Sequence, residues 1–413
     1  MRQYGNVAVV ALVAVAASCA TGGSDWEGSV TDSAGVTIVT NTEQGTWGDG
    51  DAWTLVEELK IGTLDDPDYQ FAQIGFIAVG SDGTLYVLDA QAQQIQVYSA
   101  EGTYQKTIGR PGAGPGELGQ GAAFIVMGQG DTLLVPDLAN RRVNLYDAGG
   151  ESLTSFPLSL EQGLPMLWRA TTAGVVARQS RPLGLPGSAE GDSMDVVTAL
   201  NMDGSIRDTL IAFRSGGTIN LGGGTPQLKL FAAEPVWTMN DNLSVFYGVN
   251  DEYRIGIYDS GALTGIIAMP FEPRTVTERD QETVLDGLME FARRSGAPPA
   301  QLQGLRSIIT FGETFPAFAA LQVGPGGTLW VQHIRDISSM SDAELANFNL
   351  LEDTGAADWD VFDADGRYLG VVTMPDRFSP RLFMGDKLYG VWRDDLDVQY
   401  VVRLKIDQPS ETD

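Results

Sequence analysis

Short runs of alternating apolar and polar residues cover most of this chain, and each run ends in a turn rich in Gly and Asp. In the first well-defined segment four such runs follow one another, over 74–79, 85–88, 95–98 and 104–108. Alternation with a period of two between Gly/Asp turns is typical of half-buried antiparallel strands. The pattern therefore predicts one four-stranded antiparallel sheet in this segment.

The same unit recurs along the chain at a fixed interval. The heptapeptide that ends at Asp89 has a counterpart that ends at Asp137, 48 residues later. Gly102 and Gly150, each in the turn after a third strand, are also 48 residues apart. A period of this length indicates stacked copies of one supersecondary unit. Less regular copies follow, so that the six expected units cover 74–108, 124–156, 168–213, 236–269, 319–374 and 380–404.

The sixth unit contains only three strands, and the N-terminal segment 53–61 supplies a spare one. The tetrapeptide at 59–62 resembles that at 106–109, which ends the fourth strand of the first unit. Pairing the spare strand with the sixth unit would close a ring and leave no open sheet edge at the seam. We therefore predict an all-β fold: a six-bladed β-propeller with four-stranded blades, in which an N-terminal strand closes the last blade.

The longest segment without strand periodicity, 270–316, predicts one helical insertion of two helices. Thr277 is suited to cap the first helix, and the prolines at 298 and 299 are suited to begin the second. The long connections join either the second and third strands of a unit or successive units, so they share one face of the disc. Long loops on a rigid scaffold are where propellers bind their ligands, so we expect the site there. The insertion is either a lid over the channel mouth or a hairpin packed beside a blade.

The N-terminus has the pattern of an export signal. Arg2 precedes a short apolar run at 7–17, which is too short to span a membrane as a helix. The small residues at 16–18 precede Cys19, the only cysteine of the chain. This segment resembles the bacterial lipobox, although Ala16 stands where leucine is usual. The resemblance implies lipid attachment at Cys19, and Ala20 implies sorting to the outer membrane of the cell envelope.

The expected organisation is then a lipoprotein signal peptide over 1–18, a flexible tether over 19–32, the propeller over 33–408 and a C-terminal tail over 409–413. The alternative for the N-terminus is an ordinary signal peptide that is cleaved nearby, with Cys19 incidental. In either case the mature chain carries no transmembrane helix.

The second unit also carries a family resemblance. Its segment from Asp137 through Asn140 and Arg142 to Tyr146, preceded by the Gly/Pro-rich stretch 108–118, resembles the NHL-type repeats of bacterial six-bladed propellers. The first unit departs from this pattern, with Ala92 in place of Asn140. The similarity covers about residues 71–158 and implies a bacterial propeller lipoprotein with NHL-like repeats.

Charge and composition limit the classes of molecule that this protein can bind. The formal net charge is −28, from 54 acidic and 26 basic residues, which repels nucleic acid and anionic lipid surfaces. A hydrophobic content of 43% is enough for a sizeable core. With a single cysteine no internal disulfide can form, so the fold depends on packing.

Three polar residues occupy the same place in three units, at the end of the second strand. They are Asp89, Asp137 and His333, the only histidine, and all should reach the long-loop face. There they are candidates for a binding face, and His333 could act as a base or a pH-sensitive ligand. The alternative is that they hydrogen-bond backbone groups between blades. A zinc site with several histidines is excluded by their number.

Two functions follow from these observations. The first is a non-catalytic binding propeller that uses the long-loop face for a protein, peptide or glycan partner and needs no cofactor. The second is a hydrolase that resembles six-bladed calcium-dependent lactonases or arylesterases, with carboxylate and amide oxygens holding calcium in the central channel. The sequence does not identify the ligand.

Overall fold

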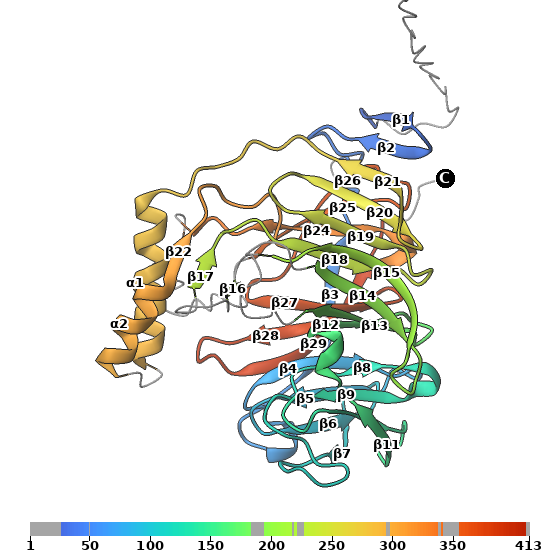
Figure 1. The fold of residues 1–413 in the computed structure, drawn as a ribbon, viewed down its shortest axis with the longest axis vertical. Coiled ribbons are helices and arrows are strands. Elements are labelled where there is room, and N and C mark those ends of the chain that lie inside the picture. Colours follow the sequence, from blue (N-terminus) through green and yellow to red (C-terminus); the bar gives the residue numbers. More distant parts are fainter. Residues whose placement is uncertain are drawn as a thin grey trace, which may run out of the picture.

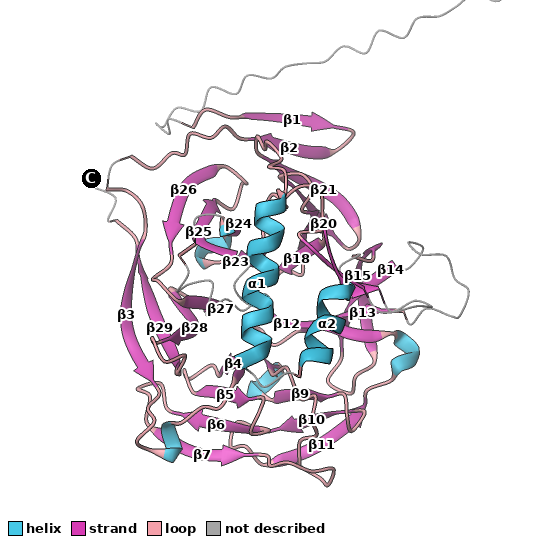
Figure 2. Cartoon of the chain, turned by 90° about the vertical axis from the view of Figure 1, so that its left-hand side faces the viewer, coloured by secondary structure: helices cyan, strands magenta, loops and turns pink. Residues whose placement is uncertain are grey.

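Six blades, each with four antiparallel strands, surround one axis, so the predicted six-bladed β-propeller is confirmed (Figure 2). The structure is a computed structural model that describes residues 26–48, 50–182, 194–216, 219–220, 227–294, 298–337, 340–341 and 355–409. Neighbouring sheets pack face to face, and their apolar side chains form the core clusters between the blades. The core is therefore divided among the blade interfaces, as period-two strands with two buried faces require.

The first five blades follow chain order, each as an antiparallel sheet. Blade 1 contains β4 (Ile74–Val79), β5 (Leu85–Asp89), β6 (Gln94–Tyr98) and β7 (Tyr104–Ile108). Blade 2 contains β8 (Val126–Met127), β9 (Leu133–Asp137), β10 (Arg142–Tyr146) and β11 (Ser152–Pro157). Blade 3 contains β12 (Leu164–Ala170), β13 (Val176–Arg181), β14 (Met194–Leu200) and β15 (Ile206–Arg214). Blade 4 contains β18 (Pro235–Met239), β19 (Val245–Val249), β20 (Arg254–Asp259) and β21 (Ala262–Ala268), and blade 5 contains β23 (Ala320–Val323), β24 (Leu329–Ile334), β25 (Gly355–Phe362) and β26 (Tyr368–Thr373).

Blade 6 is built from both ends of the chain, which confirms the predicted closure. It contains β27 (Phe378–Met384), β28 (Lys387–Arg393), β29 (Gln399–Asp407) and the N-terminal β3 (Thr54–Ile61). β3 pairs antiparallel with β29, with Ile61 opposite Val401 and Thr54 opposite Asp407. Glu58 of β3 adds ion pairs of 3.2 Å to Arg403 and 3.5 Å to Lys387. The N-terminal strand is thus held by a full ladder and by charge.

The glycines that mark the repeat have a shared structural reason. Gly102 and Gly150 adopt φ values of 82° and 77°, a conformation that other residues rarely take. A Cβ at Gly102 would lie 2.7 Å from Leu59 of β3, and one at Gly150 would lie 3.0 Å from Ile108 of β7. Each of these turns therefore packs against the outer strand of the preceding blade. The glycines therefore recur every 48 residues because of this contact between blades as well as because of the turn itself.

An N-terminal hairpin, β1 (Ser29–Ser33) and β2 (Val36–Thr40), was not predicted. β2 pairs in parallel with β21, which extends the sheet of blade 4 to six strands. Asn41, which follows β2, is buried and donates to the carbonyls of Ala268 and Gly366 at 3.3 and 3.0 Å. The flexible tether predicted over 19–32 is therefore wrong at its end, because residues 29–32 belong to β1. Residues 1–25, with Cys19 and the predicted signal peptide, lie outside the described residues.

The helical insertion is confirmed as α1 (Glu278–Arg294) and α2 (Pro299–Ile308). Thr277 caps α1 as predicted: its hydroxyl accepts from the backbone N–H of Asp280 at 3.3 Å, and the carboxylate of Asp280 accepts from the backbone N–H of Thr277 at 2.9 Å. After α2, β22 (Ile309–Phe311) pairs in parallel with β17 (Gln227–Leu230), which also pairs with β16 (Ile219–Asn220). We call α1, α2, β16, β17 and β22 the cap.

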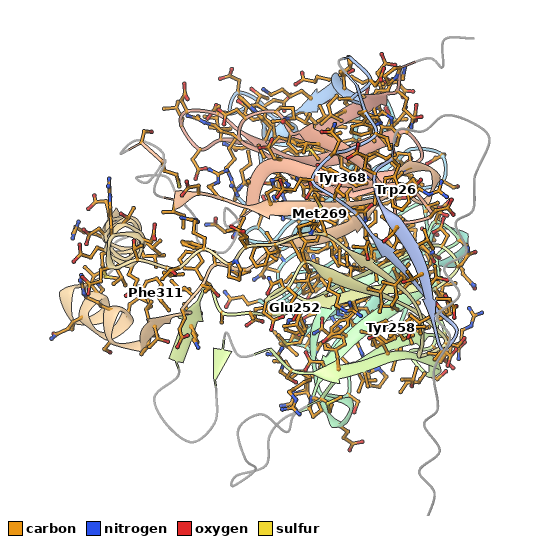
Figure 3. All side chains as sticks on the ribbon, turned by 90° about the horizontal axis from the view of Figure 1, so that it is seen from above. Trp26, Glu252, Tyr258, Met269, Phe311 and Tyr368 are labelled. Atoms are coloured by element: carbon orange, nitrogen blue, oxygen red, sulfur yellow. The ribbon has the colours of Figure 1, made fainter. Side chains whose placement is uncertain are left out.

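The cap has an apolar core of its own, which includes Leu230, Val284, Met289 and Ile309. It stands off one side of the propeller, and Phe311 lies out with the helices (Figures 1 and 3). Viewed from that side, α1 crosses in front of the centre of the ring (Figure 2). Of the two predicted arrangements, a lid over the channel mouth therefore describes the insertion better than a hairpin beside a blade.

The two faces of the disc differ, as the loop lengths predicted. The cap and the long connections share one face, the long-loop face. The tight turns between first and second strands lie on the opposite face. Two of them form 3₁₀ turns, η2 (Gln129–Asp131) and η4 (Pro325–Gly327), and two others are joined by a hydrogen bond of 2.5 Å from Thr172 to Asp241. Further 3₁₀ turns are η1 (Pro67–Tyr69) and η3 (Leu160–Gln162). Among the described residues no helix has the length and apolar character needed to cross a membrane.

The contribution of ring closure can be measured with two truncations in the same strand. Ile61 is 2% exposed and packs between blades 6 and 1, whereas Val56 is 49% exposed. We expect Ile61→Ala to lower the free energy of unfolding by about 2–5 kcal/mol, and Val56→Ala to lower it by less than about 1 kcal/mol. Urea denaturation followed by tryptophan fluorescence measures both. Equal losses would contradict a structural role for the seam.

Candidate functional site

The three residues singled out in the sequence lie on the long-loop face, in three different blades, and the structure does not bring them together. Asp89 is 1% exposed, and its carboxylate accepts from the backbone N–H groups of Ala72, Gln73 and Ala92 at 2.7, 3.2 and 2.8 Å. It therefore ties the connection before β4 to the turn after β5. These hydrogen bonds stabilise the blade and leave the carboxylate of Asp89 few acceptor positions for a ligand.

Asp137 plays the same part in blade 2. It is fully buried and accepts from the backbone N–H of Gly119 at 2.7 Å and from the backbone N–H and side-chain amide of Asn140 at 3.0 and 2.7 Å. Arg142 donates to the carbonyls of Ala113, Gly114 and Glu117 at 3.0, 2.5 and 2.9 Å. The residues that carry the NHL-like resemblance therefore hold the Gly/Pro-rich loop before blade 2.

His333 has a different environment from the two aspartates. Its Nε2 lies 2.9 Å from Oδ1 of Asp360 on β25, and its side chain is 38% exposed whereas that of Asp360 is 4% exposed. Tyr253, in the turn after β19, donates to Oδ2 of Asp360 at 2.6 Å, and Tyr368 of β26 donates to Oδ1 at 2.9 Å. One buried carboxylate is thus held by three donors from two adjacent blades.

The charges of this cluster follow from its hydrogen bonds. The bond to Asp360 raises the pKa of His333, although partial burial acts in the opposite direction. Burial raises the pKa of Tyr253 and of Tyr368, and the charge of Asp360 adds to both shifts. Both tyrosines therefore remain hydroxyl donors at neutral pH, and His333 is the group that can gain or lose a proton.

A cavity of about 420 Å³ opens beside this cluster, and we call it the His333 pocket. Phe271 and Phe315 form walls from the two segments that lead to and from the cap, so the pocket lies at the root of the insertion. Arg274 lies over the ring of Phe315, 3.8 Å from its centre, and reaches Asp336 at 3.3 Å. Figure 3 shows Met269 and Tyr368, two more lining residues, close together on the propeller body.

The lining limits the chemistry of the pocket. It contains a protonatable imidazole, a guanidinium, carboxylates and phenols, but no serine, threonine or cysteine among the described residues that form it. A His–Asp pair commonly activates such a nucleophile. Here the pair can exchange a proton or hold a polar group, beside four aromatic rings.

Sequence reasoning placed His333 on the correct face but missed Asp360 and the two tyrosines. One signal was present: Asp360 pairs across the sheet with the third residue of β24, and the corresponding positions in blades 1, 2 and 3 are Gln96, Asn144 and Thr198. A carboxylate at a position where blades 1 to 3 have uncharged polar residues distinguishes blade 5 from these blades. The tyrosines carry no comparable signal, because Tyr253 reaches Asp360 across 107 residues of sequence.

The central channel does not assemble the donors that the calcium alternative needs. Its cavity is lined by the guanidinium-bearing Arg169 and Arg381, and the one carboxylate in the lining, Asp131, belongs to a turn at the rim. Across the described part of the chain, no three His, Cys, Asp or Glu side chains are grouped to hold a metal ion. Nothing in the described channel therefore favours a calcium-dependent hydrolase.

Comparisons with known proteins agree on the fold. Residues 37–165 match a family model described as a 6-bladed beta-propeller. Among curated proteins, none matches this sequence significantly. A predicted exported protein from Bacteroides fragilis is similar in structure, with 13% identity and a TM-score of 0.50, over 90% of this chain and 100% of its own.

Two further solved structures are similar at lower scores. A member of the DUF4221 family from Bacteroides vulgatus has 12% identity and a TM-score of 0.48, over 87% of this chain and 99% of its own. A virginiamycin B lyase from Staphylococcus aureus has 12% identity and a TM-score of 0.42, over 86% of this chain and 99% of its own. At these identities the likeness concerns the fold alone.

The single histidine makes the charge state of the cluster directly observable. We expect the imidazole proton signals of His333 to titrate with a pKa above the ordinary value of about 6.5. In Asp360→Asn the midpoint should fall below that value, because the charge partner is lost and burial remains. Proton NMR between pH 5 and 9 gives both midpoints, and Asp358→Asn on the same strand, which removes only a smaller charge contribution, should lower the midpoint by less. An unchanged midpoint in Asp360→Asn would show that the pair is not formed in solution.

Proposed function

We propose that this protein is a non-catalytic binding propeller of the bacterial cell envelope that holds its ligand in the His333 pocket. The observation that carries the proposal is the buried Asp360, with His333 and two tyrosines bound to it, beside a cavity at the root of the cap. Buried polar networks of this kind are costly unless fully satisfied, and they fix the donors around them in one geometry. A rigid set of donors next to a cavity is what specific binding needs.

The pocket favours an uncharged ligand that has both an apolar face and hydroxyl groups. Phe271, Phe315, Tyr253 and Tyr368 supply aromatic surface. The charged groups include two opposed pairs, His333 with Asp360 and Arg274 with Asp336, and one further carboxylate, Glu43, so the pocket offers hydrogen bonds with a small acidic excess. A sugar residue of an envelope glycan has this combination of surfaces. A volume of about 420 Å³ is within the usual range for a small-ligand site.

Two features argue for binding rather than catalysis at this pocket. The described lining offers no hydroxyl or thiol nucleophile for His333 to activate. The raised pKa values of Tyr253 and Tyr368 make these phenols weak acids, so they do not form phenolates at neutral pH. We therefore assign to the cluster the role of positioning a ligand.

A lipid anchor at Cys19 is part of the same proposal. The lipobox-like sequence that ends at Cys19 supports lipid attachment, and Ala20 supports the outer membrane as the destination. Trp26, where the described chain begins, lies six residues after Ala20, and β1 follows at the outer edge of blade 4. A lipid at Cys19 would therefore hold the propeller at its rim, and the long-loop face would remain accessible. The NHL-like repeats of blade 2 support a bacterial propeller of this type.

The ligand class can be tested with the single histidine as a reporter. We expect the imidazole signals of His333 to shift in a saturable way when soluble chitin, cellulose or maltose oligosaccharides or muropeptides are added one at a time. Phe271→Ala should weaken the response of the active sugar at least about tenfold, through loss of aromatic contact. Tyr104→Ala, a half-buried aromatic in blade 1, is the matched control and should bind normally.

Three results would each contradict a different part of the proposal: the ligand class, the location of the site, or binding itself. A shift caused by short peptides and by none of the sugars would overturn the glycan assignment. A response that Phe271→Ala leaves unchanged would place the binding site outside the His333 pocket. Absence of any response to sugars and peptides would contradict the proposed function.

The anchor is tested separately by substitution of its one attachment residue. In a Gram-negative host, we expect the full chain to incorporate an alkyne-labelled fatty acid and to sediment with outer membranes. Cys19→Ser should lose the label, since no other thiol can accept it. An unlabelled, soluble wild-type protein would mean that the signal peptide is of the ordinary type.

A further inference from the structure

A second cavity, of about 340 Å³, lies on the axis of the propeller, and we call it the axial pocket. It reaches the face opposite the cap, because the tight turns that contain Ser81, Asp131 and Thr172 form its rim. The first strands of the blades supply its walls, where polar side chains such as Thr238 and Gln322 alternate with a set of apolar ones: Phe76, Met127, Met239, Val323, Leu382 and Met384. It is therefore separate from the His333 pocket in both place and character.

One wall of the axial pocket carries the guanidinium of Arg169, from β12. Its Nη2 donates to the backbone carbonyl of Trp237 at 3.3 Å, and the group lies 5.6 Å from the centre of the Trp237 ring. Its Nε is buried and has no hydrogen-bond partner among the described residues. Burial alone lowers the pKa of Arg169 to about 10, with no neighbouring carboxylate to oppose the shift. The group is therefore still cationic at neutral pH.

Two buried carboxylates of this protein, Asp195 and Asp360, show how a buried charge is compensated. Asp195 is fully buried and accepts from Arg181 at 3.0 Å, from Gln179 at 2.6 Å and from Ser215 at 2.5 Å. Asp360 has its three donors. A buried ion without a counter-charge is costly, which is why such ions are normally paired. Among the described residues no carboxylate pairs with Arg169.

The rim does not supply the missing charge. Asp131 is the carboxylate of the lining, and its two oxygens accept from the backbone N–H and the hydroxyl of Ser81 at 2.9 and 2.6 Å. It joins blades 1 and 2 at the surface, whereas Arg169 and Arg381 lie on the strands further in. The pocket thus has an apolar wall and a cationic inner region.

We propose that the axial pocket binds an amphipathic carboxylate, with the carboxylate on Arg169 and an alkyl or aryl body along the apolar wall. The guanidinium presents a fork of donors that matches a carboxylate, and such charge-assisted bonds are strong where water is excluded. The volume is sufficient for a medium-chain fatty acid, and the wall removes its chain from water. This site does not depend on the His333 pocket, because it opens on the other face.

The test uses octanoate as the probe, with octyltrimethylammonium as a probe of similar body and opposite charge. We expect saturable octanoate binding by calorimetry, accompanied by a change in tryptophan fluorescence, since Trp237 contacts Arg169. Arg169→Met should weaken octanoate binding at least about tenfold, because the buried charge partner is lost. Arg207→Met, which removes the same charge from an exposed site on β15, is the matched control and should bind normally.

The melting temperature separates a ligand-binding arginine from a structural one. Without ligand, Arg169→Met should melt no lower than the wild type, since the substitution removes a partly buried cation that has no counter-charge. A marked fall in melting temperature would mean that Arg169 serves the fold through Trp237, and would overturn the proposal. So would octyltrimethylammonium binding as tightly as octanoate, octanoate binding unchanged in Arg169→Met, or no binding of octanoate at all.

Discussion

The pairing of β3 with β29 is the contact on which the rest of the structure depends. Each blade can bury both faces of its sheet only when it has a neighbour on each side, and the first and last blades become neighbours only when the ring is closed. Ile61 shows the coupling directly, since it belongs to the last blade by hydrogen bonding and packs with Tyr98 of the first. Both candidate pockets lie between blades, so their geometry follows from this closure.

Local signals in the sequence were sufficient to predict most of the architecture. Turn glycines and period-two strands mark the blades because each turn both reverses the chain and packs against the preceding blade. Thr277 and the prolines before α2 mark helix ends through local hydrogen bonding and backbone geometry. The hairpin of β1 and β2 and the parallel pair of β17 and β22 were missed for the opposite reason. Their partners are distant in sequence, and parallel edge pairing leaves no local pattern.

The same distinction explains what could be predicted of the candidate site. The repeat period located His333 at the end of a second strand, and so on the long-loop face. Its partner Asp360 was not predicted, because the corresponding positions are polar in several other blades as well. Tyr253 comes from a turn of blade 4, so its contact with Asp360 of blade 5 depends on the angle between these two blades, whereas Tyr368 comes from the strand that pairs with β25. The uncompensated charge of Arg169 is likewise visible only when the neighbouring blades are in place, because nothing beside it in the sequence marks it as buried.

The His333 pocket and the axial pocket give the protein two faces with different chemistry, one slightly acidic and rich in aromatic rings, the other with apolar side chains around a cationic interior. The central claim is that the face beneath the cap is the binding face. Hydrogen–deuterium exchange, measured with and without a mixture of soluble envelope glycans, tests it most directly. The account predicts slower exchange in the segments around Phe271 and Phe315, with no change in the tight turns of the opposite face. Unchanged exchange in those two segments, with protection elsewhere on the propeller, would contradict it.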